Sequence, residues 1–267
     1  MGLVVPLKKS ANSAYLELKN LLNEKLNKVE ELIQLKLKSN VNLIEKMSNH
    51  LLSSGGKRLR ALLTLGSAKL TGYKQEIRDI NLAACVELIH SATLLHDDVI
   101  DESKQRRGKP TANEKWKNKT SVLVGDFLFS RAFQLMTKYG NTETLKILAD
   151  TSVVISEGEV LELVNDKNLE INENIYFEVV NAKTASLFSA ACQVGSISAL
   201  GTEAEVNALK SFGTNFGMTF QLIDDAIDYS SNKKILGKNT GDDFKEGKIT
   251  LPIICLLYTS PSPRDRG

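Results

Sequence analysis

The chain has 267 residues, enough for one large domain with a substantial core or at most two small domains. It is 42% hydrophobic and 25% charged, which is typical of a soluble globular protein. The formal net charge of +2 argues against bulk electrostatic attraction to nucleic acid or to an anionic membrane, so functional charge must lie in local clusters.

Cysteine usage and the N-terminal residues bear on the compartment. Cys85, Cys192 and Cys255 are far apart and show no metal-ligand spacing, which favours reduced, unpaired thiols. The start "MGLVVPLKKS" lacks the pattern of a signal peptide. No apolar run reaches the length of about 18 residues that a membrane-spanning helix needs. We therefore expect a cytoplasmic protein without a membrane span.

Helical patterns follow one another along most of the chain. Residues 16–38 predict an amphipathic helix, because apolar side chains recur at spacings of three, four and seven: Leu18, Leu21, Leu22, Val29, Leu32 and Ile33. Buried or half-buried helices are predicted at 82–101, 120–136, 144–163 and 177–200. Proline is nearly absent before the last seven residues, and no useful strand pattern occurs. We predict an all-α fold of eight to ten helices.

The C-terminal segment "LLYTSPSPRDRG" breaks this pattern. We expect one domain over residues 1–255, shortened at its C-terminal side because a core helix begins near Ile249. Residues 256–267 are interpreted as a disordered or non-native tail, and both possibilities stay open.

Two acidic clusters share the spacing Asp-Asp-x-x-Asp. They lie in "LLHDDVIDESKQRRG", residues 94–108, and "FQLIDDAIDYSSNKK", residues 220–234. Positions i and i+4 share one face of a helix, so each cluster groups its carboxylates: Asp97, Asp98 and Asp101, and Asp224, Asp225 and Asp228. Apolar neighbours place the carboxylates in poorly solvated surroundings, where they repel one another and a cation would relieve the repulsion.

The donor set favours a hard ion, because no His or Cys recurs in the ligand pattern, and Mg²⁺ is the expected cofactor. A solvated acidic helix end is the alternative for a single cluster, but two clusters of identical spacing favour the metal. For His96, next to Asp97, a structural role is preferred over metal ligation.

Basic residues supply the matching charge for an anion. "SSGGKRLR" places Lys57 and Arg60 three positions apart, predicted on one helical face, and Arg106 and Arg107 follow the first acidic cluster. "NAKTA" contains Lys183 and Thr184, and the glycine-rich "LGKNTGDDFKEGKITLP" contains Lys238 and Lys248. Each segment alone reads as an ordinary basic surface. Together with the acidic clusters they indicate a metal-bridged diphosphate bound by Lys and Arg.

Six segments in this order resemble the trans-isoprenyl diphosphate synthases, also called polyprenyl synthetases: "GGKRLR", "LIHSATLLHDDVIDESKQRRGKPT", "VGDFLFSRAF", "AKTASLF", "FQLIDDAIDY" and "GKNTGDDFKEGKITLP". The resemblance runs from about residue 10 to residue 254. It implies a helical bundle around a deep central cavity, usually a homodimer. It also implies condensation of isopentenyl diphosphate with an allylic diphosphate.

The resemblance assigns roles by position. The metal ligands would be Asp97, Asp98, Asp101, Asp224, Asp225 and Asp228. The isopentenyl diphosphate site would contain Lys57, Arg60, His90 and Arg107. The allylic diphosphate side would contain Arg106, Lys183, Thr184, Gln221 and Lys238, with Lys248 in the loop that closes over it; Lys183, Thr184 and Gln221 are expected to act in catalysis.

Product length is expected to depend on the residues one and two turns before Asp97. Small side chains at Ala92 and Thr93 would leave the cavity floor open, so that the tail extends past Ile89. We therefore expect a long-chain all-trans product of the octaprenyl or decaprenyl type, such as the side chain of ubiquinone. Blockage of the tunnel by another residue would instead give farnesyl or geranylgeranyl diphosphate.

Three further expectations concern class and partners. A terpene cyclase is disfavoured because the second metal motif of that class differs, and a non-catalytic subunit of a heteromeric synthase is disfavoured because all six aspartates are present. No nucleic acid partner is expected. Contact with a membrane would be peripheral, for product release.

Overall fold

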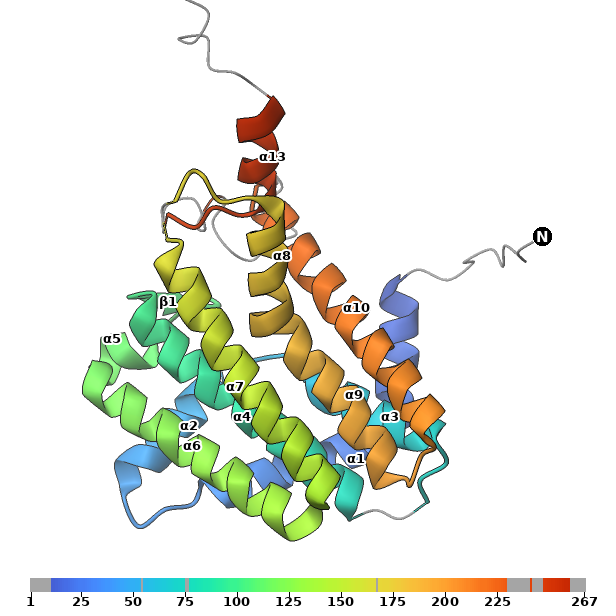
Figure 1. Cartoon of the computed structure of the whole chain (residues 1–267). Helices are drawn as coiled ribbons and strands as arrows, with labels where there is room; N and C mark the ends of the chain where they lie inside the picture. The colour runs from blue at the N-terminus through green and yellow to red at the C-terminus, as the bar shows by residue number, and fades with distance from the viewer. Residues whose placement is uncertain are drawn as a thin grey trace, which may run out of the picture.

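The computed structural model describes residues 11–53, 55–74, 77–166, 168–229, 241 and 247–259. These residues form a bundle of α-helices (Figure 1). The N-terminal half contains α1 (Ala11–Leu37), α2 (Asn42–Ser53), α3 (Leu59–Leu70), α4 (Arg78–Ile100), α5 (Ala112–Trp116) and α6 (Asn118–Tyr139). The C-terminal half contains α7 (Thr142–Val164), α8 (Glu173–Val180), α9 (Ser186–Ser198), α10 (Glu203–Asp228) and α13 (Leu251–Thr259).

The predicted all-α class is confirmed, with local differences. The described residues contain eleven α-helices, more than the predicted eight to ten, and the five-residue α5 is among them. A two-residue antiparallel pair, β1 (Gln105–Arg106) with β2 (Lys109–Pro110), closes the loop after α4. The helix predicted over 177–200 is interrupted by a π-helical turn, η1 (Asn181–Ala185).

The hydrophobic pattern of α1 was predicted correctly apart from one position. Its buried stripe consists of Leu22, Leu26, Val29, Ile33 and Leu37. Leu21 was assigned to this face but is 59% exposed. Leu22 is the next residue, and because consecutive helical residues differ by about 100°, Leu22 points into the core while Leu21 points to the outside of this helix.

Helix α4 runs through the middle of the bundle and packs against α1, α3, α6 and α9. Leu82, Leu88 and Leu95 along its length are fully buried. This burial explains the continuous apolar pattern of residues 82–95, and it fixes the position of the acidic residues at the C-terminal end of the helix.

The C-terminal ends of α4, α7 and α10 lie at the same end of the bundle, the upper end in Figure 1. Thr202 begins α10 with a capping box shared with Glu205, and Asn141 caps the first turn of α7. Near the same end, Ile254 of α13 is fully buried in a small cluster with Tyr176 and Val180. Three helices therefore present their last turns to one region.

Two further expectations concern the chain end and the membrane. Helix α13 extends through residues 256–259, the first four positions of the segment interpreted as a tail, and residues 260–267 lie outside the described part. Among the residues that the structure describes, no helix is both long and apolar enough to span a membrane.

Candidate active site

The first acidic cluster lies where α4 ends. Asp97 and Asp98 belong to its last turn, and Asp101 is its C-cap residue. Asp98 is 1% exposed, and its Oδ1 accepts hydrogen bonds from Nε (3.0 Å) and Nη2 (2.9 Å) of Arg106. Its Oδ2 is buried without a hydrogen-bond partner. One carboxylate oxygen in the cluster therefore retains acceptor capacity for a ligand.

The loop after α4 returns Arg106 to this cluster. The β1–β2 pair reverses the chain there, and Asn113 Nδ2 donates to the backbone oxygens of Asp98 (2.9 Å) and Ser103 (3.2 Å). Asp101 is in turn paired with Lys248, with 2.9 Å between Nζ and Oδ2. Arg106 and Lys248, both predicted to bind a diphosphate, thus meet the first acidic cluster.

The second acidic cluster lies in the last turns of α10. Asp224 is exposed, whereas Asp225 and Asp228 are buried. Asp225 accepts hydrogen bonds from the Tyr176 hydroxyl (2.5 Å) and from Gln221 Nε2 (2.7 Å). Burial raises the pKa of Asp225, and these two hydrogen bonds oppose the increase.

A hydrogen-bond chain extends from Asp225 to the π-helical turn. Because Gln221 donates its amide N–H to Asp225, its Oε1 is directed to Thr184, whose hydroxyl donates to it at 2.9 Å. Thr184 and Gln221, which were both predicted to act in catalysis, are therefore in direct contact, and Asp225 orients the amide.

Lys183 is paired with two glutamates beside the first acidic cluster. Its Nζ is 2.7 Å from Oε2 of Glu159 and 2.5 Å from Oε2 of Glu162, both on α7. Its charge also acts on Asp97, while the charge of Glu162 acts on Asp225. The two clusters are thus brought into one electrostatically connected site.

Like charges and burial raise two pKa values here. Burial raises the pKa of Asp97, with a further increase from Asp101, although Lys183 and Arg106 oppose it. Burial and the Asp97 carboxyl raise the pKa of Glu159 to about 7. Within the described residues, no group of three or more His, Cys, Asp or Glu side chains is arranged to hold a metal ion. Ammonium and guanidinium groups compensate the carboxylates instead.

Glu159 and Glu162 were not predicted from the sequence. In "SEGEVLELV" they resemble ordinary charges on an amphipathic helix. One feature of the sequence could have indicated them: they lie three positions apart, on one helical face, directly after Gly158. A glycine inside a helix often marks a place where another segment packs closely.

Basic side chains gather beside the first cluster, around the start of α3. Arg60 is stacked on the Phe188 ring, with 4.2 Å from Cζ to the centroid, and burial lowers its pKa to about 10. Arg107 lies beside Gly56 and donates to the Gly55 carbonyl. The charges of four arginines act on His90: Arg58, Arg60, Arg106 and Arg107.

The predicted shared helical face of Lys57 and Arg60 is wrong. Helix α3 begins at Leu59, so Lys57 precedes it and is exposed. The reason is Arg58, whose φ of 48° lies in the left-handed region and turns the chain before the helix begins. Its side chain is fixed by Glu30 at 2.6 Å.

Glu87 was also missed. This side chain is 3% exposed, accepts a hydrogen bond from the Ala61 amide at 3.0 Å and lies 3.8 Å from Arg58. It therefore anchors the first turn of α3, which holds Arg60, to α4.

The surroundings of His90 predict a dependence of stability on pH. Burial and four guanidinium groups lower its pKa well below the ordinary value of 6.5. As pH falls below about 6.5, the unfolded chain binds a proton at this histidine before the folded chain does, so the free energy of unfolding falls. We expect His90→Gln to flatten this decline by up to about 1.4 kcal/mol per pH unit, measured by urea unfolding between pH 7 and pH 5. Equal slopes for the two proteins would contradict this assignment.

A cavity of about 260 Å³ lies among α4, α6 and α7. Ile89, Thr93, Phe129 and Ile155 are among its lining residues. Ala92 is not; it is fully buried in the main core. His96 also lines the cavity, 3.2 Å from the Val122 carbonyl and 3.4 Å from Asp126, contacts that favour a structural role.

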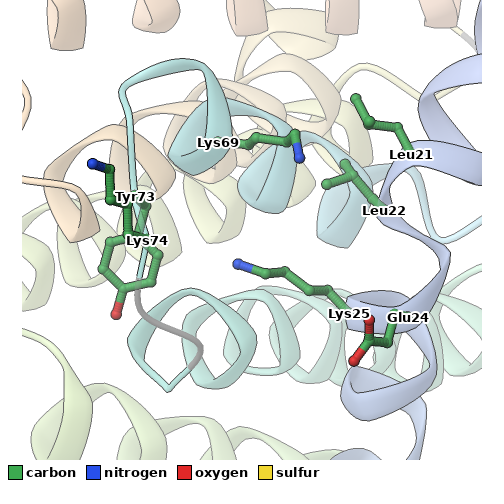
Figure 2. Close-up of a pocket in the computed structure, with 7 residues that line it drawn as sticks. All are labelled: Leu21, Leu22, Glu24, Lys25, Lys69, Tyr73 and Lys74. Atoms are coloured by element: carbon green, nitrogen blue, oxygen red, sulfur yellow. The ribbon is translucent and has the colours of Figure 1, made fainter.

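A second hollow of about 270 Å³ lies at the other end of α4 (Figure 2). Lys25, Lys69 and Tyr73 project around it, and Lys25 is paired with the buried Asp79 at 2.6 Å. Eighteen helical residues, roughly 27 Å, separate Asp79 from Asp97. This hollow is therefore remote from the carboxylates. Lys238, which was predicted to bind the allylic diphosphate, lies outside the described residues.

The chain is similar to known proteins in both sequence and structure. Residues 41–266 match the family model "Polyprenyl synthetase". The octaprenyl diphosphate synthase of Haemophilus influenzae is 44% identical over 238 residues, covering 89% of this chain and 72% of the relative. Among solved structures, a decaprenyl diphosphate synthase from Rhodobacter capsulatus has a TM-score of 0.88 at 48% identity, covering 94% of this chain and 78% of that one. A polyprenyl synthase from Caulobacter crescentus, complexed with calcium and isoprenyl diphosphate, has a TM-score of 0.90 at 46% identity, covering 94% and 76%.

Proposed function

Because the chain belongs to the polyprenyl synthetase family, a family of prenyltransferases, we propose that it extends an allylic diphosphate with isopentenyl diphosphate to a long-chain all-trans polyprenyl diphosphate. The observation that carries this proposal is the single site formed at the ends of α4 and α10. There Lys183 and Glu162 connect the two acidic clusters electrostatically, and the arginines around His90 lie alongside.

The arginine-rich side is proposed to bind isopentenyl diphosphate through Lys57, Arg60, His90 and Arg107. Arg60 suits this role because its Nε is buried without a hydrogen-bond partner, and burial strengthens its attraction for an anion. The stack on Phe188 holds the guanidinium plane in place. Neutral His90 adds a hydrogen-bonding group without a further positive charge.

The carboxylate side is proposed to bind the allylic diphosphate through Mg²⁺, held by Asp97, Asp98, Asp101, Asp224, Asp225 and Asp228. The residues fit such an ion: all donors are carboxylate oxygens, and the buried Oδ2 of Asp98 and Oε1 of Glu159 have no hydrogen-bond partner. When bound, the ion would neutralise the charge of the diphosphate leaving group. Arg106, Lys183 and Lys248 would contribute to the same neutralisation.

The remaining steps of the reaction depend on how the two substrates are positioned relative to each other. Heterolysis of the allylic C–O bond releases pyrophosphate and leaves an allylic carbocation, which the double bond of the neighbouring isopentenyl diphosphate captures. The tertiary cation that results loses a proton to the released pyrophosphate, and this loss forms the new double bond. Thr184 and Gln221 are proposed to direct oxygen dipoles toward that cation. Their mutual hydrogen bond and the Gln221–Asp225 contact fix the direction of these dipoles in advance.

The cavity lined by Ile89, Thr93 and Phe129 is proposed to receive the growing chain, because it begins one turn before Asp97 on the same helix.

The decisive assay is incubation with farnesyl diphosphate, labelled isopentenyl diphosphate and Mg²⁺, followed by sizing of the extracted lipids. Products longer than geranylgeranyl diphosphate are expected. Shorter products would indicate a short-chain synthase, hydrocarbon from the starter alone would indicate a cyclase, and no product would indicate a non-catalytic subunit.

We further propose that the protein forms a homodimer through an exposed apolar stripe on α7. Val153, Val160 and Val164 share one face of this helix and are 57%, 59% and 70% exposed. Val160→Asp is expected to convert a dimer into a monomer in sedimentation velocity, because burying a carboxylate in an apolar contact is unfavourable. Val41→Asp, at a similarly exposed valine away from α7, should leave the dimer intact. A monomeric wild-type protein would contradict the proposal.

A further inference from the structure

The π-helical turn places Lys183 directly against α7. A Cβ on Gly158 would lie 2.6 Å from the Cβ of Ala182 and 3.1 Å from the Lys183 backbone nitrogen, closer than atoms can approach without a shift. Glycine at position 158 therefore permits the contact between the two segments. The lysine side chain consequently emerges beside Glu159 and Glu162, which follow Gly158 on the same helix.

The two glutamates hold the lysine from both sides. Their Oε2 atoms are 2.7 and 2.5 Å from Nζ, and the side chains of Lys183 and Glu159 are only 21% and 14% exposed. Lys183 and Asp97 influence each other electrostatically, yet no ion pair joins them in the part of the chain that the structure describes.

The other lysine of the site pairs directly with the first cluster. Lys248 lies 2.9 Å from Asp101, the partner of Asp97 in that cluster, and the charge of Glu162 acts on it as well. A lysine that reaches this cluster therefore pairs with its carboxylate. The position of Lys183 away from Asp97 needs a cause, and the two glutamates provide one.

We propose that Glu159 and Glu162 are positioning residues that hold Lys183 away from Asp97, so that the Asp97 carboxylate stays available to a divalent cation. This inference rests on the proposed function. Without the clamp, the ammonium group would pair with Asp97 and compete with the cation for the same oxygens. With the clamp, Lys183 keeps its charge near the diphosphate position and does not pair with the Asp97 oxygens, although Asp97 also lies within hydrogen-bonding reach of Glu159.

Glu162→Gln tests this directly, because it keeps the size of the side chain and removes its charge. Two readouts are needed: the half-saturating Mg²⁺ concentration for chain extension, and the Mn²⁺ retained by the protein in the presence of inorganic pyrophosphate, from the electron paramagnetic resonance signal of free Mn²⁺. Both affinities are expected to weaken roughly tenfold, the effect of one competing charge-assisted hydrogen bond. Glu178→Gln, an exposed glutamate on α8, serves as the control and should change neither readout.

The second arm replaces Lys183 itself. If Glu162 acts through this lysine, then adding Glu162→Gln to Lys183→Met should no longer weaken Mn²⁺ retention. Unchanged affinities in Glu162→Gln, or a weakening that persists in the double variant, would overturn the proposal. A wild-type protein that makes no prenyl product would instead contradict the proposed function, and the Mn²⁺ readout would still report on the clamp.

Discussion

Asp97→Asn is expected to lower kcat/KM for chain extension about 1,000-fold, close to 4 kcal/mol of transition-state stabilisation. Asparagine keeps the shape of the side chain but loses the charge that would hold a cation beside the diphosphate. The measurement is steady-state incorporation of labelled isopentenyl diphosphate at saturating Mg²⁺.

The same substitution should not weaken the fold. Burial and the Asp101 carboxyl raise the pKa of Asp97, so the ionised form is disfavoured in the folded protein. An uncharged asparagine avoids the cost of burying that charge. We expect the midpoint of thermal unfolding to stay equal or to rise. Asp150→Asn is the matched control, since Asp150 is an exposed aspartate that pairs with Lys146 on the surface of α7. A retained rate in Asp97→Asn, or a loss caused by unfolding, would contradict the role of Asp97.

Thr93→Phe is expected to shorten the product. Thr93 is half-buried and lines the cavity of about 260 Å³ among α4, α6 and α7, so a phenyl ring there would occupy the space proposed for the growing chain. The rate of the first condensation should stay within about twofold, because the reacting ends lie at the acidic clusters and not in the cavity. Chromatographic sizing of the dephosphorylated products checks this.

Ala92→Phe separates a cavity effect from a packing effect. Ala92 is fully buried in the main core and does not line this cavity, so the larger side chain should destabilise the fold by about 1–3 kcal/mol or more. If Ala92→Phe shortened the product in a stable protein while Thr93→Phe left it unchanged, the proposed path of the chain would be wrong.

These residues also show how far sequence patterns reach. The apolar period of α4 predicted its burial, and the i, i+4 spacing predicted that Asp97 and Asp101 act on each other, because helical geometry is local and regular. Whether Ala92 or Thr93 faces the cavity could not be predicted in this way. Adjacent helical positions differ by about 100°, and the packing of α6 and α7 decides which of them meets empty space.

Contacts between segments distant in the sequence could not be predicted either, because they also depend on how the helices pack against one another. Glu159 and Glu162 reach Lys183 only because the π-helical turn packs closely on Gly158. Glu87 supports α3 only because α4 passes beneath its first turn. The start of α3 was misplaced because the left-handed backbone of Arg58 has no sequence signature as clear as that of glycine.

The most direct measurement is a crystal structure of the protein with Mg²⁺ and the unreactive farnesyl thiodiphosphate. We expect Mg²⁺ ions bound to this one diphosphate to be ligated by Asp97 from α4 and by Asp224 from α10, with Lys183 beside the ligand. A diphosphate bound away from these carboxylates, or Asp97 and Asp224 too far apart to share it, would contradict the proposed site.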